Sequence, residues 1–243
     1  MRTFLKTFSL RSALGVHAST LFALAACLGC SSAPDDAGEG GGQVAFAPLS
    51  REPTSKGVTV ESAQLSLALV SLEACAADTA TLQTRNFPIE LLHEPAPRVI
   101  FVSAVTDYCS VGVDLAPAGA SDLLPDLKGY TVLLRGTRAD GAAFELKSTL
   151  LTSFVFESSS LLAADKLVVG VDLERWLSDV DLDAATTTDD VALVDADDNP
   201  EELAAFDAAV GGAFALYADA NGDGTLSESE LTPVATAAEA ATE

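Results

Sequence analysis

Alternation of apolar and polar residues in short runs is the feature that most constrains the fold of this 243-residue chain. Leu65, Leu67 and Leu69 alternate with Gln64 and Ser66. A side chain on the same face at every second residue is the period of a half-buried β-strand. The pattern therefore predicts a strand whose leucines face a core.

The alternation recurs in residues 130–134 and 143–147, with Asp140 and Gly141 between the two runs. Both of these residues can adopt the positive φ angles of a two-residue hairpin turn. The sequence therefore predicts a β-hairpin at this point.

Further apolar runs bounded by turn residues occupy residues 99–105, 111–115, 150–156 and 167–171. Seven or eight short strands in a segment of this length are typical of a single β-sandwich. We therefore expect a mainly β fold, with one antiparallel β-sandwich of immunoglobulin or transthyretin type at residues 57–171.

Cys75 and Cys109 are the two cysteines within this segment. Neither has a second Cys or a His at metal-ligand spacing, which argues against a thiolate metal site. In an oxidising compartment we expect them to form a disulfide. Closing a loop of this length would stabilise the fold by about 3–4 kcal/mol in the chain-entropy estimate.

Residues 219–230 read D-A-N-G-D-G-T-L-S-E-S-E and form a twelve-residue pattern of oxygen-bearing side chains. Calcium takes six to eight oxygen ligands, and a loop of this length supplies them from positions 1, 3, 5, 7, 9 and 12. Position 6 is Gly224, where a sharp turn disfavours a Cβ. The residues at the ligand positions are Asp219, Asn221, Asp223, Thr225, Ser227 and Glu230.

This pattern resembles the calcium loop of the EF-hand family, over twelve of the 243 residues. The resemblance implies side-chain oxygens from the first three positions and the backbone carbonyl of Thr225. It also implies a hydroxyl or bridging water at Ser227 and both carboxylate oxygens of Glu230. Leu226 at position 8 matches the apolar residue that normally pairs with a second loop. We therefore expect the chain to bind Ca²⁺.

EF-hand loops usually work in pairs, and the partner could come from another chain or from residues 179–190, which keep only part of the pattern. Ala184 replaces the turn glycine, and Thr186 replaces the apolar pairing residue. The favoured interpretation is a solvated acidic linker, with a degenerate second calcium site as the alternative. A single unpaired loop would bind weakly, at about 10⁻⁴–10⁻³ M. The acids at positions 1, 3, 5 and 12 are Asp179, Asp181, Asp183 and Asp190.

Helical patterns flank the loop unevenly. Asn199 and Pro200 indicate the start of a helix that presents apolar residues on one face as far as Tyr217, although two glycines interrupt it. Pro233 allows only a short or kinked helix after the loop. We therefore expect residues 172–243 to form an acidic helical segment that bears the EF-hand. A helix near Asp172 would bury Leu173, Trp176, Leu177 and Val180.

The N-terminus has the features of an export signal. Basic residues precede an apolar stretch at 13–26 that is too short to span a bilayer. Residues 24–27, Leu-Ala-Ala-Cys, resemble the lipobox of bacterial lipoprotein precursors, which implies cleavage before Cys27 and acylation of that cysteine. Residues 1–26 are thus predicted to be a lipoprotein signal peptide, and residues 27–56 a flexible linker.

Cys30 is the alternative acylation site, but it lacks the usual aliphatic residue three places upstream. In lipoproteins of double-membraned bacteria, an Asp directly after the acylated cysteine favours retention in the inner membrane. Leu28 follows Cys27, so the resemblance implies an outer-membrane lipoprotein that faces the periplasm or the cell surface.

Acidic residues dominate the charge of the chain. There are 36 Asp and Glu against 13 Lys and Arg, for a formal net charge of −23. From residue 171 onward the only basic residue is Arg175. Such a field repels nucleic acid and anionic lipid and concentrates cations, so the sequence excludes nucleic acid as a partner.

The sequence contains no G-x-S-x-G, H-E-x-x-H or phosphate-binding glycine motif, and His93 is the one histidine after the signal peptide. We therefore expect no enzymatic activity. The preferred role is a calcium-binding, lipid-anchored envelope protein that is structural or binds a protein or glycan. The alternatives are a calcium-stabilised carbohydrate-binding sandwich, with Trp176 or tyrosines as stacking surfaces, and a carboxylate-dependent hydrolase.

Overall fold

The computed structural model shows a chain that consists mainly of β-strands, which confirms the predicted class. Residues 36–243 form one compact unit. The predicted signal peptide, Cys27 and Cys30 lie outside the residues that the structure describes. Those described residues are 42–75, 82–93, 98–103, 108–120, 123–162, 166–223 and 225–239.

The strands are β1 (Gly42–Pro48), β2 (Thr54–Ser55), β3 (Val58–Ala74), β4 (Leu82–Glu90), β5 (Arg98–Ser103), β6 (Tyr108–Leu115), β7 (Val132–Thr137), β8 (Ala143–Ser148), β9 (Thr152–Leu162), β10 (Lys166–Val171), β11 (Thr187–Thr188), β12 (Val191–Val194), β13 (Phe214–Ala218) and β14 (Ala235–Glu239). The helices are α1 (Leu173–Trp176) and α2 (Pro200–Val210), with 3₁₀ turns η1 (Pro125–Leu127), η2 (Gly211–Ala213) and η3 (Glu228–Glu230). Strands β3 to β10 occupy the range in which seven or eight strands were predicted.

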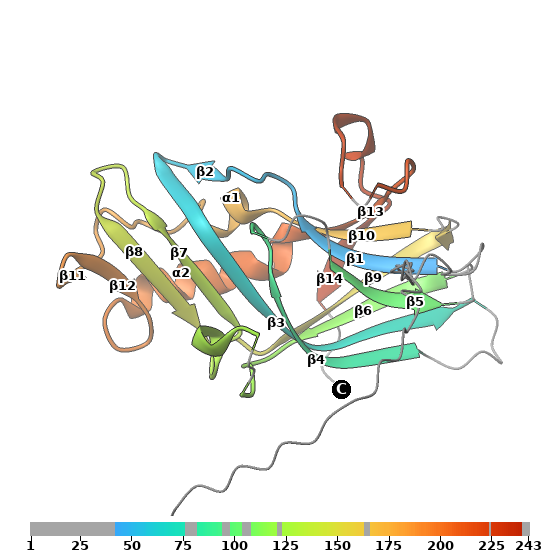
Figure 1. Ribbon diagram of the computed structural model, residues 1–243, viewed down its shortest axis with the longest axis horizontal. Helices are drawn as coiled ribbons and strands as arrows, with labels where there is room; N and C mark the ends of the chain where they lie inside the picture. The colour runs from blue at the N-terminus through green and yellow to red at the C-terminus, as the bar shows by residue number, and fades with distance from the viewer. Residues whose placement is uncertain are drawn as a thin grey trace, which may run out of the picture. The chain divides into compact units, whose positions relative to one another are not determined.

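All of these strands belong to one sheet, in the order β11-β12-β8-β7-β3-β6-β9-β14-β13-β10-β1-β5 (Figure 1). β2 and β4 pair with β3 outside this path, and β4 also contacts β5. The pairs β1–β10 and β12–β8 are parallel. The sheet is therefore mixed and not purely antiparallel, although the pairings between strands inside residues 57–171 are all antiparallel. The two parallel pairs each involve a strand, β1 or β12, that lies outside the predicted sandwich segment.

The long strand β3 joins the two parts of the sheet, because its first half pairs with β7 and its second half with β6. Its register shifts between Val60 and Ser62 and again between Leu67 and Leu69. A β-bulge inserts an extra residue and reverses the alternation after it. Leu69, predicted on the core face, is therefore only half-buried. The buried apolar residues of β3 are Val58, Val60, Ala63, Leu65, Leu67, Val70 and Leu72.

The predicted hairpin between β7 and β8 is present, but its connection is longer than two residues. Thr137 pairs with Ala143, and the N–H of Arg138 donates to the carbonyl of Ala142. Gly141 alone has a positive φ, while the Asp140 carboxylate accepts the N–H of Ala142 and closes a wider loop.

A two-residue hairpin occurs instead between β11 and β12, within the segment predicted as a linker. Asp189 and Asp190 have φ angles of 52° and 65°. Positive φ at both central residues is the geometry of a type I′ turn.

The C-terminal region is less helical than predicted. α1 begins after Asp172, whose carboxylate accepts the N–H of Arg175, and the four apolar residues predicted for this helix are buried. α2 begins after Asn199 as predicted but ends at Val210. Two glycines of low helix propensity follow in η2, and the chain then forms β13, which pairs with β10. The predicted helix as far as Tyr217 is therefore wrong beyond Val210.

The segment after the calcium-loop sequence is also a strand, β14, which pairs with β13 and β9. β13 and β14 thus lie within the sheet, between β10 and β9. Residues 172–243 share one compact unit with residues 57–171. β1, at Gly42–Pro48, lies inside residues 27–56, which were predicted to be a flexible linker.

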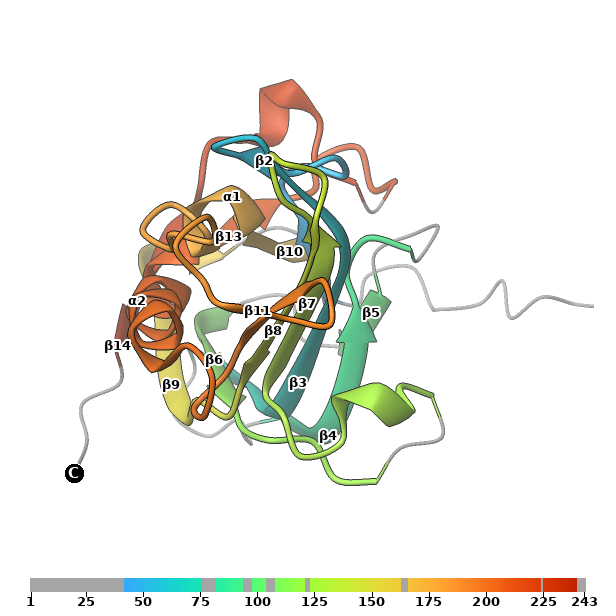
Figure 2. The same ribbon diagram turned by 90° about the vertical axis from the view of Figure 1, so that its left-hand side faces the viewer.

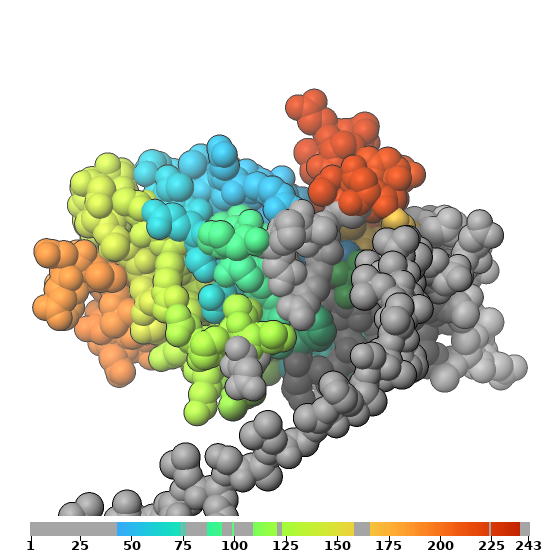
Figure 3. All heavy atoms as spheres, in the orientation of Figure 1, coloured from blue at the N-terminus to red at the C-terminus, as the bar shows by residue number. Residues whose placement is uncertain are grey.

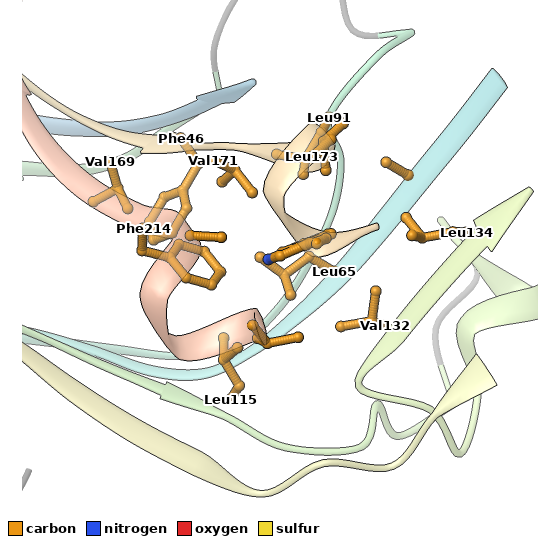
Figure 4. Packing of buried hydrophobic residues seen from close by; sticks show 14 of the residues in the cluster. Phe46, Leu65, Leu91, Leu115, Val132, Leu134, Val169, Val171, Leu173 and Phe214 are labelled. Atoms are coloured by element: carbon orange, nitrogen blue, oxygen red, sulfur yellow. The ribbon is translucent and has the colours of Figure 1, made fainter. Parts of the chain in front are cut away.

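The core lies between the sheet and the two helices. Figure 2 shows α1 and α2 on one side of β3, β7 and β8. In Figure 4, Phe214, Phe46 and Val169 face Val132 and Leu134 across this interior. Trp176 of α1 packs edge-on against Phe206 of α2, with ring centroids 5.7 Å apart, and lies 5.8 Å from Phe214. Burial of each large side chain stabilises the fold by about 1.5–3 kcal/mol.

The structure confirms the predicted disulfide. Cys75, directly after β3, is bonded to Cys109 in β6, and their Cα atoms are 4.9 Å apart. The bond therefore joins neighbouring strands at one end of β3.

Candidate metal centre

The calcium-loop sequence forms the connection between β13 and β14 and stands out from the sheet (Figures 1 and 3). At the entrance, the N–H of Asp219 donates to the carbonyl of Lys166 over 3.1 Å. At the exit, the N–H of Val234 donates to the carbonyl of Leu216 over 2.8 Å. Strands of the sheet, in place of the two helices of an EF-hand, therefore hold the loop ends.

The carboxylate of Glu230 connects the two ends of this loop. Its Oε1 accepts the N–H groups of Ala220 at 2.8 Å and Asn221 at 3.2 Å. Its Oε2 accepts the N–H of Ser227 at 2.9 Å and the Ser227 hydroxyl at 2.6 Å. Glu230 is only 8% exposed. Glu230, at position 12, thus connects the first residues of the loop to its last residues by hydrogen bonds.

Side chains at the earlier ligand positions fold the first half of the loop into consecutive turns. Asp219 Oδ1 accepts the N–H of Gly222 at 2.7 Å, and Asn221 Oδ1 accepts the N–H of Asp223 at 2.8 Å. Asp223 Oδ1 accepts both the N–H and the hydroxyl of Thr225. Asp and Asn side chains commonly form such turns by accepting a main-chain N–H two or three residues further on.

These hydrogen bonds favour the charged form of two acids. The hydroxyl and N–H of Ser227 hold the pKa of Glu230 below its ordinary value, with smaller contributions from Asn221 and Ala220. The hydroxyl and N–H of Thr225 lower the pKa of Asp223 in the same way. The loop therefore presents ionised carboxylates at neutral pH.

Leu226, at position 8, docks the loop on the sheet. Its partly buried side chain packs on the cluster formed by Ala45 and Ala47 of β1 and Val168 of β10. The resemblance implied a second loop as the partner of this residue. In this chain the outer surface of the sheet takes that place.

The chemistry of the loop fits a hard dication, because every predicted ligand presents oxygen. Hydrogen bonds connect five of the six predicted ligand residues directly. Asn221 and Ser227 both bond to Glu230. Asp223 bonds to Asn221 and to Thr225. Asp219 joins them through Gly222. Among the described residues, however, no group of three or more His, Cys, Asp or Glu side chains is gathered closely enough to hold a metal ion. Gly224 lies outside these residues. The carboxylate of Glu230 already accepts hydrogen bonds from the main chain of Ala220, Asn221 and Ser227. To bind a metal ion, it would have to give up these partners.

The upstream segment 179–190 has a different environment. Val180, Leu182 and Ala185 are buried in the core, so this segment is packed rather than a solvated linker. Asp181 Oδ1 accepts the N–H of Ala184, and Asp190 belongs to the β11–β12 turn. A second calcium site in this segment stays a prediction.

Other side chains considered in the sequence lie apart from the loop. Trp176 is fully buried, which makes it a core residue rather than a stacking surface. Tyr217 is 5% exposed. His93 is exposed, with Nδ1 3.6 Å from Glu90 Oε1.

Lys166 is a neighbour of the loop that sequence reasoning missed. Its Nζ donates to the carbonyl of Gly222, and its stem would be within 3.6 Å of a Cβ at that glycine. The two residues are 56 positions apart, and only the pairing of β10 with β13 brings them together. No local pattern could have indicated this contact.

No helix in the described part of the chain is long and apolar enough to cross a membrane. Comparison of the chain with protein families, with curated proteins and with solved structures found no match.

Proposed function

We propose that residues 219–230 bind Ca²⁺, and that the protein is a lipid-anchored envelope protein with a structural or interaction role. The observation that carries the proposal is the position of Glu230. Its carboxylate already spans both ends of a loop whose other side chains offer oxygen at the spacing that calcium requires.

The ion would be held by side-chain oxygens of Asp219, Asn221, Asp223 and Glu230, by the carbonyl of Thr225 and by Ser227 or a water. It would supply positive charge among ionised carboxylates, whose repulsion it would relieve. For this, Glu230 would give up hydrogen bonds to the main chain at 220, 221 and 227. The loss of these bonds favours weak binding, of about 10⁻⁴–10⁻³ M.

The place of the loop in the sheet supports a structural role for the ion. β13 and β14 lie side by side in the sheet, and the loop joins them. A ligand that binds only the folded protein stabilises it by mass action. Calcium would therefore strengthen the β13–β14 connection, and this contribution would be significant where calcium is plentiful.

The lipid anchor and the outer-membrane location rest on the lipobox-like residues 24–27 and on Leu28. A partner in the envelope, protein or glycan, is part of the same proposal. Metabolic labelling with a fatty acid tests the anchor. Label should be lost in Cys27→Ala and kept in Cys30→Ala, and the reverse result would move the anchor to Cys30.

Calcium binding is tested by isothermal titration of the chain without its signal peptide, with Cys27 and Cys30 replaced by serine. Wild type should show a calcium-selective isotherm against magnesium. Glu230→Gln should weaken binding at least about tenfold, since it removes a charged bidentate ligand.

Glu228→Gln is the matched control, because Glu228 is an exposed acid two residues away with the same charge. It should keep most of the affinity. Absence of binding up to several millimolar calcium, or equal loss in both variants, would contradict the proposal.

A further inference from the structure

Lys166 places a fixed positive charge beside the proposed calcium loop. It is the first residue of β10, and its carbonyl accepts the N–H of Asp219, at position 1 of the loop. The next residue, Leu167, pairs with Ala218 in the β10–β13 ladder. The sheet register therefore fixes where the lysine backbone lies relative to the loop.

The side chain of Lys166 turns onto the loop instead of into solvent. Its Nζ donates to the carbonyl of Gly222, at position 4, and the residue is only half-buried. A Cβ at Gly222 would lie 3.0 Å from this Nζ and 3.5 Å from Cε. Gly222 has a φ of 73°, so the same residue provides the turn and the space for the lysine.

The ammonium also acts on a predicted ligand. The pKa of Asp223 is lowered first by the hydroxyl and N–H of Thr225, and the charge of Lys166 contributes in the same direction. The loop has acids at 219, 223, 228 and 230. The charge of Lys166 acts on Asp223 through space, and its Nζ contacts the loop directly at the carbonyl of Gly222.

We infer that Lys166 is an internal counter-ion of the loop and lowers its affinity for calcium. This inference rests on the proposed function. The ammonium partly neutralises the loop while no ion is bound and donates to a loop carbonyl. A dication that enters the same loop is repelled by this charge. Lys166 therefore sets the affinity at a weaker value than the ligands alone would give.

The first test is calcium titration of Lys166→Met beside wild type. The thioether side chain keeps most of the volume of the lysine stem and removes the charge. Calcium should bind about three- to tenfold more tightly, as expected for loss of one charge close to a dication near a hydrated surface. The difference should shrink as KCl is added, because salt screens charge but not packing.

Two variants separate this effect from simpler ones. Lys128→Met makes the same change in net charge at an exposed lysine after η1 and should leave the affinity near that of wild type. Lys166→Arg keeps the charge and should also stay near wild type. Lys166→Gln is the substitute if Lys166→Met fails to fold, as judged by thermal unfolding in EDTA.

The inference would be overturned if Lys166→Met bound calcium no more tightly than Lys128→Met, since Lys166 would then merely support the loop. If wild type binds calcium and Glu230→Gln does not, such a result refutes only the role of Lys166. If neither wild type nor any lysine variant binds calcium, the proposed function fails, and the inference with it.

Discussion

The hydroxyl of Ser148 donates a hydrogen bond of 2.6 Å to Oδ1 of Asp207 and so joins β8 to α2. Ser148 is fully buried, and its hydroxyl also accepts the N–H of Leu150 at 3.0 Å. Burial raises the pKa of Asp207 above its ordinary value, although the bond from Ser148 acts in the opposite direction. A single hydroxyl therefore holds a partly desolvated carboxylate against the sheet.

Because of this environment, we expect the free energy of unfolding to depend on the protonation of Asp207 and therefore on pH. With a raised pKa, folded Asp207 keeps its proton at pH values where the unfolded chain has lost it. The contribution of Asp207 to the free energy of unfolding is thus highest below the unfolded pKa, about 3.9, and falls as pH rises to the folded pKa. Asp207→Asn should gain stability relative to wild type as pH rises through this window, and the gain should then level off.

That difference is measured by urea unfolding at pH values from about 3.5 to about 8, a range that covers both this window and neutral pH. Asp198→Asn, at an exposed acid just before α2, is the control and should show no such trend. A difference between Asp207→Asn and wild type that is independent of pH would refute the explanation.

Ser148→Ala should destabilise the protein at neutral pH by about 1–3 kcal/mol, because it leaves the carboxylate of Asp207 and the N–H of Leu150 without this partner. The double variant with Asp207→Asn completes a thermodynamic cycle. Additive losses in the cycle would show that the two side chains are not coupled.

Removal of the disulfide should lower the free energy of unfolding by about 3–4 kcal/mol, because the bond between Cys75 and Cys109 closes a loop of 34 residues in the unfolded chain. The double serine variant is compared with wild type by urea unfolding, with and without reductant. Reductant should bring wild type to the stability of the variant and leave the variant unchanged. A variant as stable as oxidised wild type would contradict this prediction.

Gly136 is predicted to tolerate no side chain. An added Cβ would lie 2.0 Å from the carbonyl oxygen of Thr59 and 2.7 Å from Cε1 of Phe144. The main chain of β3 cannot move away without disrupting its pairing with β7, so Gly136→Ala should cost about 1–3 kcal/mol or more. Gly119→Ala is the matched control, because nothing lies within 4 Å of a Cβ there. Equal thermal stability of the two variants would contradict the packing described for β3 and β7.

Trp176, the one tryptophan of the chain, should report on the core by fluorescence. It is fully buried against Phe206 and Phe214, so its emission should be blue-shifted in the folded protein and shift to the red on unfolding. Trp176→Ala should cost about 3–5 kcal/mol. Trp176→Phe should cost less, because Nε1 is buried without a hydrogen-bond partner among the described residues. Emission typical of exposed tryptophan would place this residue outside the core.

Local chemistry determined what could be predicted from the sequence. Alternation predicted β7 and β8 within a few residues, and short apolar runs between turn residues predicted β6 and β10. Both signals depend only on local burial. A helix near Asp172 was indicated by the helical spacing of the apolar residues after it, whereas the capping role of Asp172 is seen only in the structure. The pairing of Cys75 with Cys109 followed from the small number of cysteines. The turn-forming acids of the loop were likewise visible as a local pattern.

Long-range pairing decided the rest. Residues 214–218 continue a helical pattern in the sequence, yet they form β13 because β10 and β14 supply hydrogen-bond partners on both sides. The bulges in β3, which return Val70 and Leu72 to the core, depend on its two different partners. The surroundings of the loop were decided in the same way. Leu226 and Lys166 acquire their roles from β1 and β10, and a one-dimensional pattern holds no information about which distant strand will lie beside it.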